Sequence, residues 1–103
     1  MAEKKNGVIQ QYYDEAKTKL WYEHYKFNNK EEGQYKEYYE NEQLWVICNY
    51  KNNKLEGQYK EYHENGQLWV ICNYKNGDRE RKYERYYENG QLEKICNYKN
   101  NEL

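Results

Sequence analysis

The sequence lacks several features on which common protein classes depend. It has no proline and no serine, one threonine (Thr18), and 14 leucine, isoleucine, valine and phenylalanine residues among 103. The absence of serine excludes a serine nucleophile. No apolar run approaches the ~18–20 residues of a membrane-spanning helix, and the opening residues MAEKKNG contain no apolar signal-peptide segment. We therefore expect a cytoplasmic protein that does not enter a membrane.

An excess of charge of either sign is also missing. The net charge is −1, from 17 Lys and Arg against 18 Asp and Glu. A groove that follows a phosphate backbone needs clustered Lys and Arg, so we expect no direct nucleic-acid binding. The one basic cluster lies in residues 78–85 and contains Arg79, Arg81 and Arg85. A salt-bridged strand is the favoured interpretation of this cluster, and an anion site is the alternative.

Aromatic residues are abundant instead. The chain has 15 tyrosines and three tryptophans. So few aliphatic residues would ordinarily indicate disorder. However, the low net charge and the large aromatic surface favour a folded chain. Because tyrosine is common in strands, the composition predicts an aromatic-rich all-β protein.

The chain is built from one repeated unit. Residues 57–80 read GQYKEYHENGQLWVICNYKNGDRE, and closely similar copies occupy residues 33–56 and 81–103. A looser copy, with two extra residues in its turn, occupies residues 7–32. A fixed period of this length indicates a repeat architecture. We predict one repeat domain over residues 7–103, preceded by a disordered tail at residues 1–6.

Two turn signals alternate along the repeats. One is Glu-Asn-Gly-Gln, as at Asn65 and Gly66, and the other is Lys-Asn-Gly or Lys-Asn-Asn, as at Asn76 and Gly77. Both predict two-residue type I′ hairpins, in which the central residues have positive φ. Glu42 breaks this rule and should strain its turn. The sequence therefore predicts an antiparallel meander of four ~24-residue β-hairpins, with seven or eight strands.

Two-residue turns would also fix which residues share a face of the sheet. They pair Tyr59 with Cys72, Tyr62 with Trp69, and His63 with Leu68. Across the next turn they pair Cys72 with Arg81 and Val70 with Tyr83. The predicted core face then carries Tyr59, His63, Leu68, Val70, Cys72 and Tyr74, and the opposite face carries Tyr62, Trp69 and Ile71. A bulge at Gly33 or Gly57 would change part of this assignment.

The pattern G-x-Y-K-E-Y-Y-E-N-G-Q-L, followed by N-Y-K-N-G, resembles the bacterial variant of the MORN repeat found in antitoxins of the YwqK family. The resemblance is close over residues 33–103 and loose over residues 7–32. It implies stacked β-hairpins in one elongated, twisted, single-layer sheet, and a role in protein–protein interaction. The chain departs from the pattern at Glu42 and Arg81, which stand where the unit has glycine.

The three cysteines, Cys48, Cys72 and Cys96, are spaced 24 residues apart. Each should lie on every second strand, about 9.5 Å from the next. A disulfide needs Cα atoms within about 7 Å, and zinc needs ligands at about 2.0–2.3 Å. We therefore expect free, half-buried thiols and no metal site.

No other constellation indicates catalysis. His24 and His63 have no repeated acidic or nucleophilic companion, and the glutamates follow the repeat pattern without converging. Each glycine is isolated, so no phosphate-binding loop is present. We expect neither enzymatic activity nor a cofactor.

An aromatic stripe is the main candidate site. A single-layer sheet cannot bury both of its faces, and the predicted opposite face would carry the stripe Trp21, Tyr38, Trp45, Tyr62, Trp69 and Tyr86. Exposed apolar patches often mark interfaces, and Tyr and Trp are typical interface residues. Packing within the chain is the alternative, as is a homodimer formed through this face. If the stripe only packs, the strand with Arg79, Arg81 and Arg85 is the next candidate.

The favoured functional hypothesis is a non-enzymatic binding protein that neutralises a protein partner, as an antitoxin does. One alternative is an inhibitor of a bacterial defence nuclease, encoded by a phage or mobile element in the manner of an anti-CRISPR protein. Another is a structural or membrane-surface MORN scaffold, for which the balanced charge gives little support.

Overall fold

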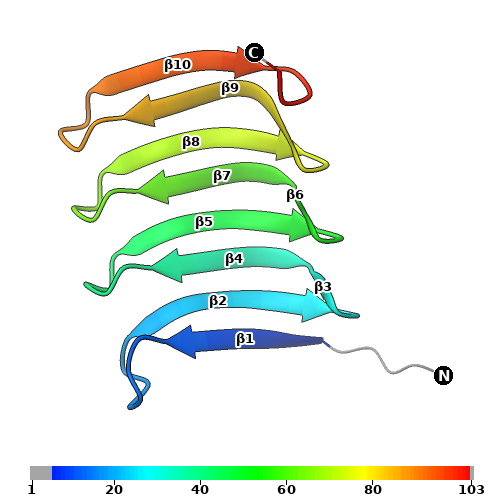
Figure 1. Cartoon of the computed structure of the whole chain (residues 1–103), viewed down its shortest axis with the longest axis vertical. Coiled ribbons are helices and arrows are strands. Elements are labelled where there is room, and N and C mark those ends of the chain that lie inside the picture. Colours follow the sequence, from blue (N-terminus) through cyan, green and yellow to red (C-terminus); the bar gives the residue numbers. More distant parts are fainter. Residues whose placement is uncertain (1–5, 103) are drawn as a thin grey trace.

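The computed structural model describes residues 6–102 and contains a single antiparallel sheet (Figure 1). The main strands follow one another along the sheet in chain order. They are β1 (Asn6–Tyr12), β2 (Leu20–Phe27), β4 (Gly33–Tyr38), β5 (Leu44–Lys51), β7 (Gly57–Tyr62), β8 (Leu68–Lys75), β9 (Asp78–Tyr86) and β10 (Leu92–Tyr98). Two short strands, β3 (Lys30–Glu31) and β6 (Lys54–Leu55), pair with β2 and β5. The predicted all-β meander of hairpins is confirmed.

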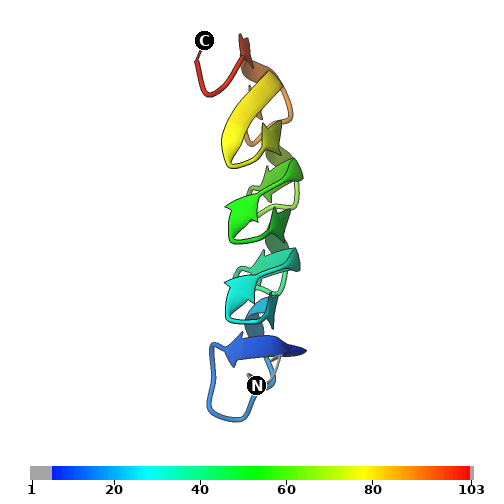
Figure 2. The same cartoon turned by 90° about the vertical axis from the view of Figure 1, so that its right-hand side faces the viewer.

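The molecule is one layer thick. Its principal extents are 48 × 35 × 12 Å, and the side view shows no second layer on either face (Figure 2). No helix suited to crossing a membrane occurs within residues 6–102. The predicted N-terminal tail lies outside the described residues, except for Asn6, with which β1 begins. Because no layer covers the sheet, its side chains must bury one another.

The turns that join one repeat to the next are the predicted type I′ turns. Asn52 and Asn53 have φ of 55° and 73°, and Asn76 and Gly77 have φ of 55° and 91°. The flanking residues Lys51 and Lys54 pair directly. Asparagine and glycine tolerate positive φ best, so this prediction is confirmed.

The turn inside each repeat differs from the prediction. His63 accepts a hydrogen bond from the Gly66 N–H at 2.9 Å, and its own N–H donates to Gln67 at 2.8 Å. Only the last loop residue, Gly66, has positive φ (90°). The loop is therefore a three-residue type I turn with a G1 bulge. It holds one residue more than expected, so Tyr62 pairs with Leu68, and the predicted Tyr62–Trp69 and His63–Leu68 pairs are wrong.

A second irregularity lies where each repeat begins. Gly33, Gly57 and Arg81 have φ of 80°, 86° and 66°, and the pairing of β8 with β9 shifts between Ile71 and Asn73. Val70 consequently pairs with Arg85, so the predicted Val70–Tyr83 pair is wrong. Arg81 pairs with Tyr98 of β10, and its predicted pairing with Cys72 is wrong. Because the shift is by two residues, side chains keep their faces.

The core lies on one face of the sheet. Its buried residues are Val46, Cys48, Val70, Cys72 and Tyr83. Cysteine pairs with tyrosine on the preceding strand, as in Tyr35–Cys48 and Tyr59–Cys72. The predicted core face is confirmed for Tyr59, Tyr74, Val70 and Cys72, and the predicted Tyr59–Cys72 pair is correct. However, Trp69 packs against this cluster, whereas Leu68 pairs with Tyr62 on the other face. The G1 loop exchanged these two residues, and a second register shift, between Glu61 and Tyr62, returns Val70 and Cys72 to the predicted face.

Candidate interaction surface

The face that carries the core is covered by a continuous series of aromatic rings, and we call it the aromatic face. At its N-terminal end the ring centroids lie 5.2–6.0 Å apart. The rings in contact, in order, are Tyr13, Trp21, Tyr22, His24, Tyr35 and Tyr50. The ring pairs Tyr59–Tyr74 and Tyr83–Tyr98 continue the pattern toward β10. Large rings thus cover the small buried valines and cysteines.

Each tryptophan stacks on the side chain that precedes the turn of its own repeat. The ring centroids of Tyr39 and Trp45 lie 4.8 Å apart with planes at 14°, and those of His63 and Trp69 lie 4.8 Å apart with planes at 20°. Tyr13 and Trp21 form the third stack at 5.4 Å. These partners are not those in the predicted stripe.

The structure therefore divides the predicted stripe between the two faces. Tyr38, Tyr62 and Tyr86 follow Glu37, Glu61 and Arg85 in their strands and point to the opposite face. There they pair with Leu44, Leu68 and Leu92. Trp21 and Trp69 contact residues of the aromatic face. One contiguous stripe of all six residues does not exist, because the extra loop residue changes the face of the tryptophans.

The rings under the tryptophans also link each repeat to the next. The hydroxyl groups of Tyr13 and Tyr39 donate to the carbonyls of Tyr38 and Tyr62 at 2.6 Å. In the third repeat His63 Nε2 lies 2.8 Å from the carbonyl of Tyr86; because a carbonyl only accepts, Nε2 carries the proton. Burial raises the pKa of Tyr13 and of Tyr39. Sequence reasoning missed this role, although the signal is the second of two adjacent aromatic residues, as in Tyr38-Tyr39.

Two carboxylates are held within the aromatic face. The Tyr35 hydroxyl donates to Glu37 at 2.9 Å, and the Tyr59 hydroxyl donates to Glu61 at 3.0 Å. Trp21 Nε1 donates to the second oxygen of Glu37 at 3.3 Å. Burial raises the pKa of both tyrosines, and the acceptor carboxylates raise it further. These glutamates are therefore fixed as acceptors.

The C-terminal part of the face is basic. The Arg79 guanidinium lies 4.9 Å from the Tyr83 ring centroid and donates to the hydroxyls of Tyr74 and Tyr98 at 3.3 and 3.1 Å. These bonds raise the pKa of Arg79, that to Tyr74 most. Arg85 Nε lies 3.4 Å from Glu93. Arg81 is exposed at its bulge, whereas Arg79 and Arg85 contact other side chains of this face.

Charge consequently changes sign along the aromatic face. Glu31, Glu37 and Glu61 lie on β3, β4 and β7. On the last two strands, β9 and β10, Arg79 occupies the repeat position of Glu31, Arg85 that of Glu37 and Glu61, and Lys94 that of Val46 and Val70. Glu31 is bound to His24 at 2.8 Å. The molecule is nearly neutral as a whole, so this asymmetry is a property of the surface that composition does not reveal.

The cysteines are free thiols. Burial raises the pKa of Cys48 to about 12 and that of Cys72 to about 11. Each lies on every second main strand, as expected from the spacing. Within residues 6–102 no three His, Cys, Asp or Glu side chains are grouped to hold a metal ion.

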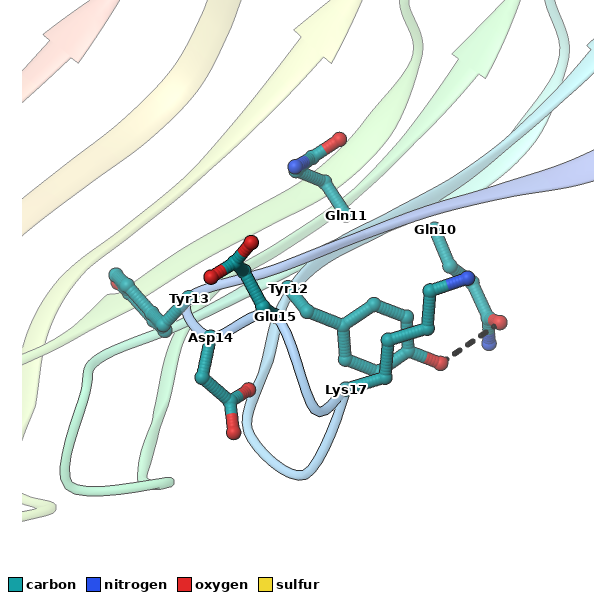
Figure 3. Close-up of a pocket in the computed structure, with 7 residues that line it drawn as sticks. All are labelled: Gln10, Gln11, Tyr12, Tyr13, Asp14, Glu15 and Lys17. Carbon is teal, nitrogen blue, oxygen red and sulfur yellow. Dashed lines mark hydrogen bonds between the residues drawn. The ribbon is translucent and has the colours of Figure 1, made fainter.

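A hollow lies beside the loop between β1 and β2 (Figure 3). It has a volume of about 350 Å³ and is lined by residues 10–15 and 17. Its Asp14 carboxylate accepts from the backbone N–H groups of Thr18 and Lys19 at 3.0 Å and from the Thr18 hydroxyl. These hydrogen bonds, that of the Thr18 side chain first, lower the pKa of Asp14. The carboxylate therefore serves to hold the loop.

One comparison with known proteins identifies a family. The family model described as MORN repeat variant matches residues 31–52, 55–76 and 82–100, which is more than half of the chain. These segments coincide with the second, third and fourth hairpins. No curated protein and no solved structure matches the chain.

Proposed function

Since the chain belongs to the MORN repeat variant family, we propose that it is a non-enzymatic protein-binding module that occupies and inhibits a protein partner in the cytoplasm, as an antitoxin does. The aromatic face is the proposed binding surface. The partner is a protein, because a long and nearly flat sheet face offers contact area rather than a deep cleft.

The aromatic face itself carries this proposal. The sheet is 12 Å thick, so no layer formed by residues 6–102 covers the rings. Trp21 is 36% exposed, and Trp45, Trp69, Tyr35 and Tyr59 are half-buried. Tyrosine and tryptophan give large contact area at low cost in side-chain entropy. Apolar surface of this extent typically marks an interface.

The polar groups of this face support binding rather than catalysis. Glu37 and Glu61 are held by tyrosine hydroxyls, and the His63 Nε2–H donates to the carbonyl of Tyr86. Arg79 is held between three tyrosines. Fixed groups of this kind favour a rigid, pre-organised surface, which lowers the entropy cost of association.

The charge pattern constrains the partner. Glutamates on β3, β4 and β7, followed by Arg79, Arg85 and Lys94 on β9 and β10, favour a partner with the opposite order of charges. Such complementarity sets orientation and the association rate more than the affinity. We expect the association rate to fall as salt is raised.

Substitutions on the two faces test the proposal. Trp69→Ala removes a ring from the aromatic face, and Tyr62→Ala removes a ring from the opposite face of the same repeat. Immobilised wild-type chain and both variants are exposed to lysate of the source organism, and the captured protein is identified, purified and assayed for inhibition. Trp69→Ala should weaken binding thirtyfold or more, the loss of about 2 kcal/mol typical of an aromatic anchor. Lys60→Ala, on the opposite face between Ile47 and Ile71, should change little.

Circular dichroism checks that each variant is folded, and Trp21→Ala, at a more exposed ring, replaces Trp69→Ala if that variant unfolds. Loss of binding in Tyr62→Ala alone would assign the interface to the opposite face. Equal binding by all folded variants, or a captured protein whose activity is unchanged, would refute the proposed inhibitor.

A further inference from the structure

The two ends of the sheet expose most of the large apolar side chains that the described chain leaves uncovered. In β1, Val8 and Ile9 are 60% and 40% exposed. At the other end Tyr87, Leu92 and Ile95 are 52%, 48% and 52% exposed. β1 and β10 are also the first and last strands of the sheet (Figure 1). An edge strand presents unpaired backbone groups that can pair with another chain.

The last repeat carries side-chain donors that the second and third repeats satisfy with the next repeat. Tyr39 donates to the carbonyl of Tyr62 at 2.6 Å, and Asn41 Nδ2 donates to that of Glu64 at 3.0 Å. His63 and Asn65 repeat both bonds to Tyr86 and Glu88. Tyr87 and Asn89 occupy these positions in the last repeat, and within residues 6–102 no strand lies beyond β10 to accept from them.

Alternate residues of β10 also direct their backbone N–H and C=O groups toward the open edge of the sheet. The Asn49 carbonyl of β5 accepts the Glu56 N–H of the next repeat at 2.9 Å. Asn97 is its counterpart in β10, so the backbone groups of Asn97 and Ile95 face the open edge. Alternate residues of an antiparallel strand bond to opposite sides.

The open edge of β1 can be assigned by the same rule. The Tyr25 carbonyl accepts the Glu32 N–H at 3.0 Å, on the side away from β1. Its neighbour His24 therefore faces β1 and pairs with Ile9. The backbone groups of Val8 and Gln10 are left facing the edge.

The two edges fit one another in the register that the repeats use. Between repeats, Val46 pairs with Glu61 and Ile47 with Lys60. The equivalent pairs between β10 and a β1 strand are Lys94 with Gln11 and Ile95 with Gln10, and continuing this register would place Cys96 opposite Ile9. β1 carries no charged residue over Asn6–Tyr12, so no like charges meet. Edge strands that avoid pairing usually carry charge, proline or a bulge, and over Asn6–Gln11 β1 has none of these.

We propose that β10 of one copy pairs antiparallel with β1 of a second copy, so that copies join head to tail in one continuous sheet. Within the chain, the carbonyls of Tyr38, Tyr62 and Tyr86 accept a hydrogen bond from a ring of the preceding repeat. In the joint, the Tyr12 carbonyl of the second copy takes this position and accepts from the Tyr87 hydroxyl. The joint covers Ile9 and Ile95. Because the contact is heterologous and translates along the sheet, it forms an open series rather than a closed dimer. This proposal goes beyond the inhibitory function, since the aromatic face stays free in every copy.

Sedimentation velocity of the purified chain, with reductant present to keep Cys96 reduced, tests this arrangement over a wide concentration range. We expect species larger than a dimer that increase with concentration. Val8→Pro and Ile95→Pro each remove one outward N–H and should each be monomeric. A mixture of the two should form a 1:1 dimer and nothing larger, because each variant retains one intact edge. Val8→Ala and Ile95→Ala keep the N–H and serve as matched controls that still form the series.

Three outcomes would overturn the proposal: a monomeric wild type at all concentrations, a dimer formed by Val8→Pro alone, or a closed dimer of the wild type. The second would indicate pairing of two β10 strands, and the third would indicate contact through a face. Should a proline variant fail to fold, Tyr87→Phe keeps the ring and removes only the hydroxyl. It should weaken association roughly fivefold, as expected for one net hydrogen bond, and an unchanged association constant would equally count against the joint.

Discussion

Single residues in this sheet are buried by their neighbours rather than by a second layer. Cys48 and Cys72 are each 2% exposed, although the sheet is 12 Å thick. Each pairs with a tyrosine of the preceding strand, and aromatic side chains next to small ones fill such a surface well. Small thiols under large rings explain how a chain poor in aliphatic residues keeps a core.

Burial of the thiols predicts their reactivity. In the native protein Cys48 and Cys72 should resist alkylation at pH 8, since burial raises their pKa to about 12 and about 11 and the thiolate is the reactive form. Cys96 is half-buried and should react first. Mass spectrometry after iodoacetamide treatment, with and without urea, measures this. Three modified cysteines are expected in urea, and fewer than three would indicate a disulfide.

The same shifts predict how stability depends on pH. An ordinary cysteine thiol ionises near pH 9.0, whereas Cys48 in the folded chain ionises near 12. Above pH 9 the unfolded chain therefore loses protons that the folded chain keeps, and the free energy of unfolding should fall between about pH 9 and 12. The raised pKa of Tyr35 and Tyr59 adds to the fall above pH 10. Urea unfolding at pH 7, 9 and 10.5 tests the sign; stability that rises with pH would contradict it.

Glu42 is a strained residue whose removal should stabilise the chain. It has φ of 74°, where the equivalent residues Gly66 and Gly90 have φ of 90°. A non-glycine residue at this φ costs about 1–2 kcal/mol. Replacing it by glycine removes this cost, but part of the gain is offset because glycine raises the conformational entropy of the unfolded chain. Glu42→Gly should therefore raise the free energy of unfolding by about 1 kcal/mol in urea denaturation.

The reverse substitution is the control for Glu42. Gly66→Glu introduces the same strain in the next repeat and should lower stability by a similar amount. Destabilisation by Glu42→Gly would show that the glutamate side chain contributes more than its backbone conformation costs.

The strands and turns show how far sequence reasoning reaches at the level of elements. Strand order and the Asn52-Asn53 turn could be predicted because periodicity and positive-φ residues point the same way. The turn at Asn65-Gly66 could not, because the same dipeptide also fits the last two positions of a three-residue loop. There the Asn65 side chain accepts the Gln67 N–H at 2.9 Å. The one extra residue moved Trp69 to the other face, since side chains alternate with period two. The register shift between Glu61 and Tyr62 then kept Val70 on the same face as Trp69.

The turns between repeats offer an element-level prediction. Asn53 and Asn101 accept, through their side-chain oxygens, the N–H of Glu31 at 2.9 Å and of Arg79 at 3.2 Å. Gly77 holds the equivalent place and has no side chain to accept the N–H of Leu55. Gly77→Asn should supply this bond and raise stability by about 0.5–1 kcal/mol. A Cβ at Gly77 would lie 3.7 Å from Lys54, which is ordinary contact.

Gly77→Ala separates the hydrogen bond from the backbone effect. Alanine keeps the strain of φ 91° and cannot accept a hydrogen bond, so thermal unfolding should show a loss of about 1 kcal/mol. If the asparagine and alanine variants lose the same amount of stability, the side-chain hydrogen bond contributes nothing.

At the scale of the whole molecule, composition predicted an aromatic surface but not its location. The sequence supplied the residues, whereas the bulges decided that tryptophans share a face with Val46 and Val70. The change of charge along that face also depends on register, since it places Arg85 opposite Val70. A repeat protein is stabilised by each unit and its neighbours, so the ends of this sheet should be its least stable parts.

The last repeat departs from the unit in a way that tests this view. Where the second and third repeats have Trp-Val, it has Glu93 and Lys94, which leaves the Tyr87 ring 52% exposed. Replacing both residues, as Glu93→Trp with Lys94→Val, should restore the stack on Tyr87 and place an apolar side chain against Tyr83. An aromatic pair contributes about 0.5–1.5 kcal/mol beyond its burial. The lost Arg85–Glu93 contact of 3.4 Å is partly exposed and contributes about 0–1 kcal/mol.

We therefore expect the double substitution to raise the free energy of unfolding by about 1 kcal/mol or more, measured by urea denaturation at low protein concentration so that self-association does not contribute. Hydrogen exchange should show the gain in β9 and β10 first, because the new contacts lie there. The reverse exchange in the third repeat, Trp69→Glu with Val70→Lys, is the matched control and should be strongly destabilising, since Val70 is 6% exposed. A loss of stability in the restored last repeat would mean that Glu93 and Lys94 hold this end of the sheet through Arg85 and Tyr83, as their contacts with these residues allow.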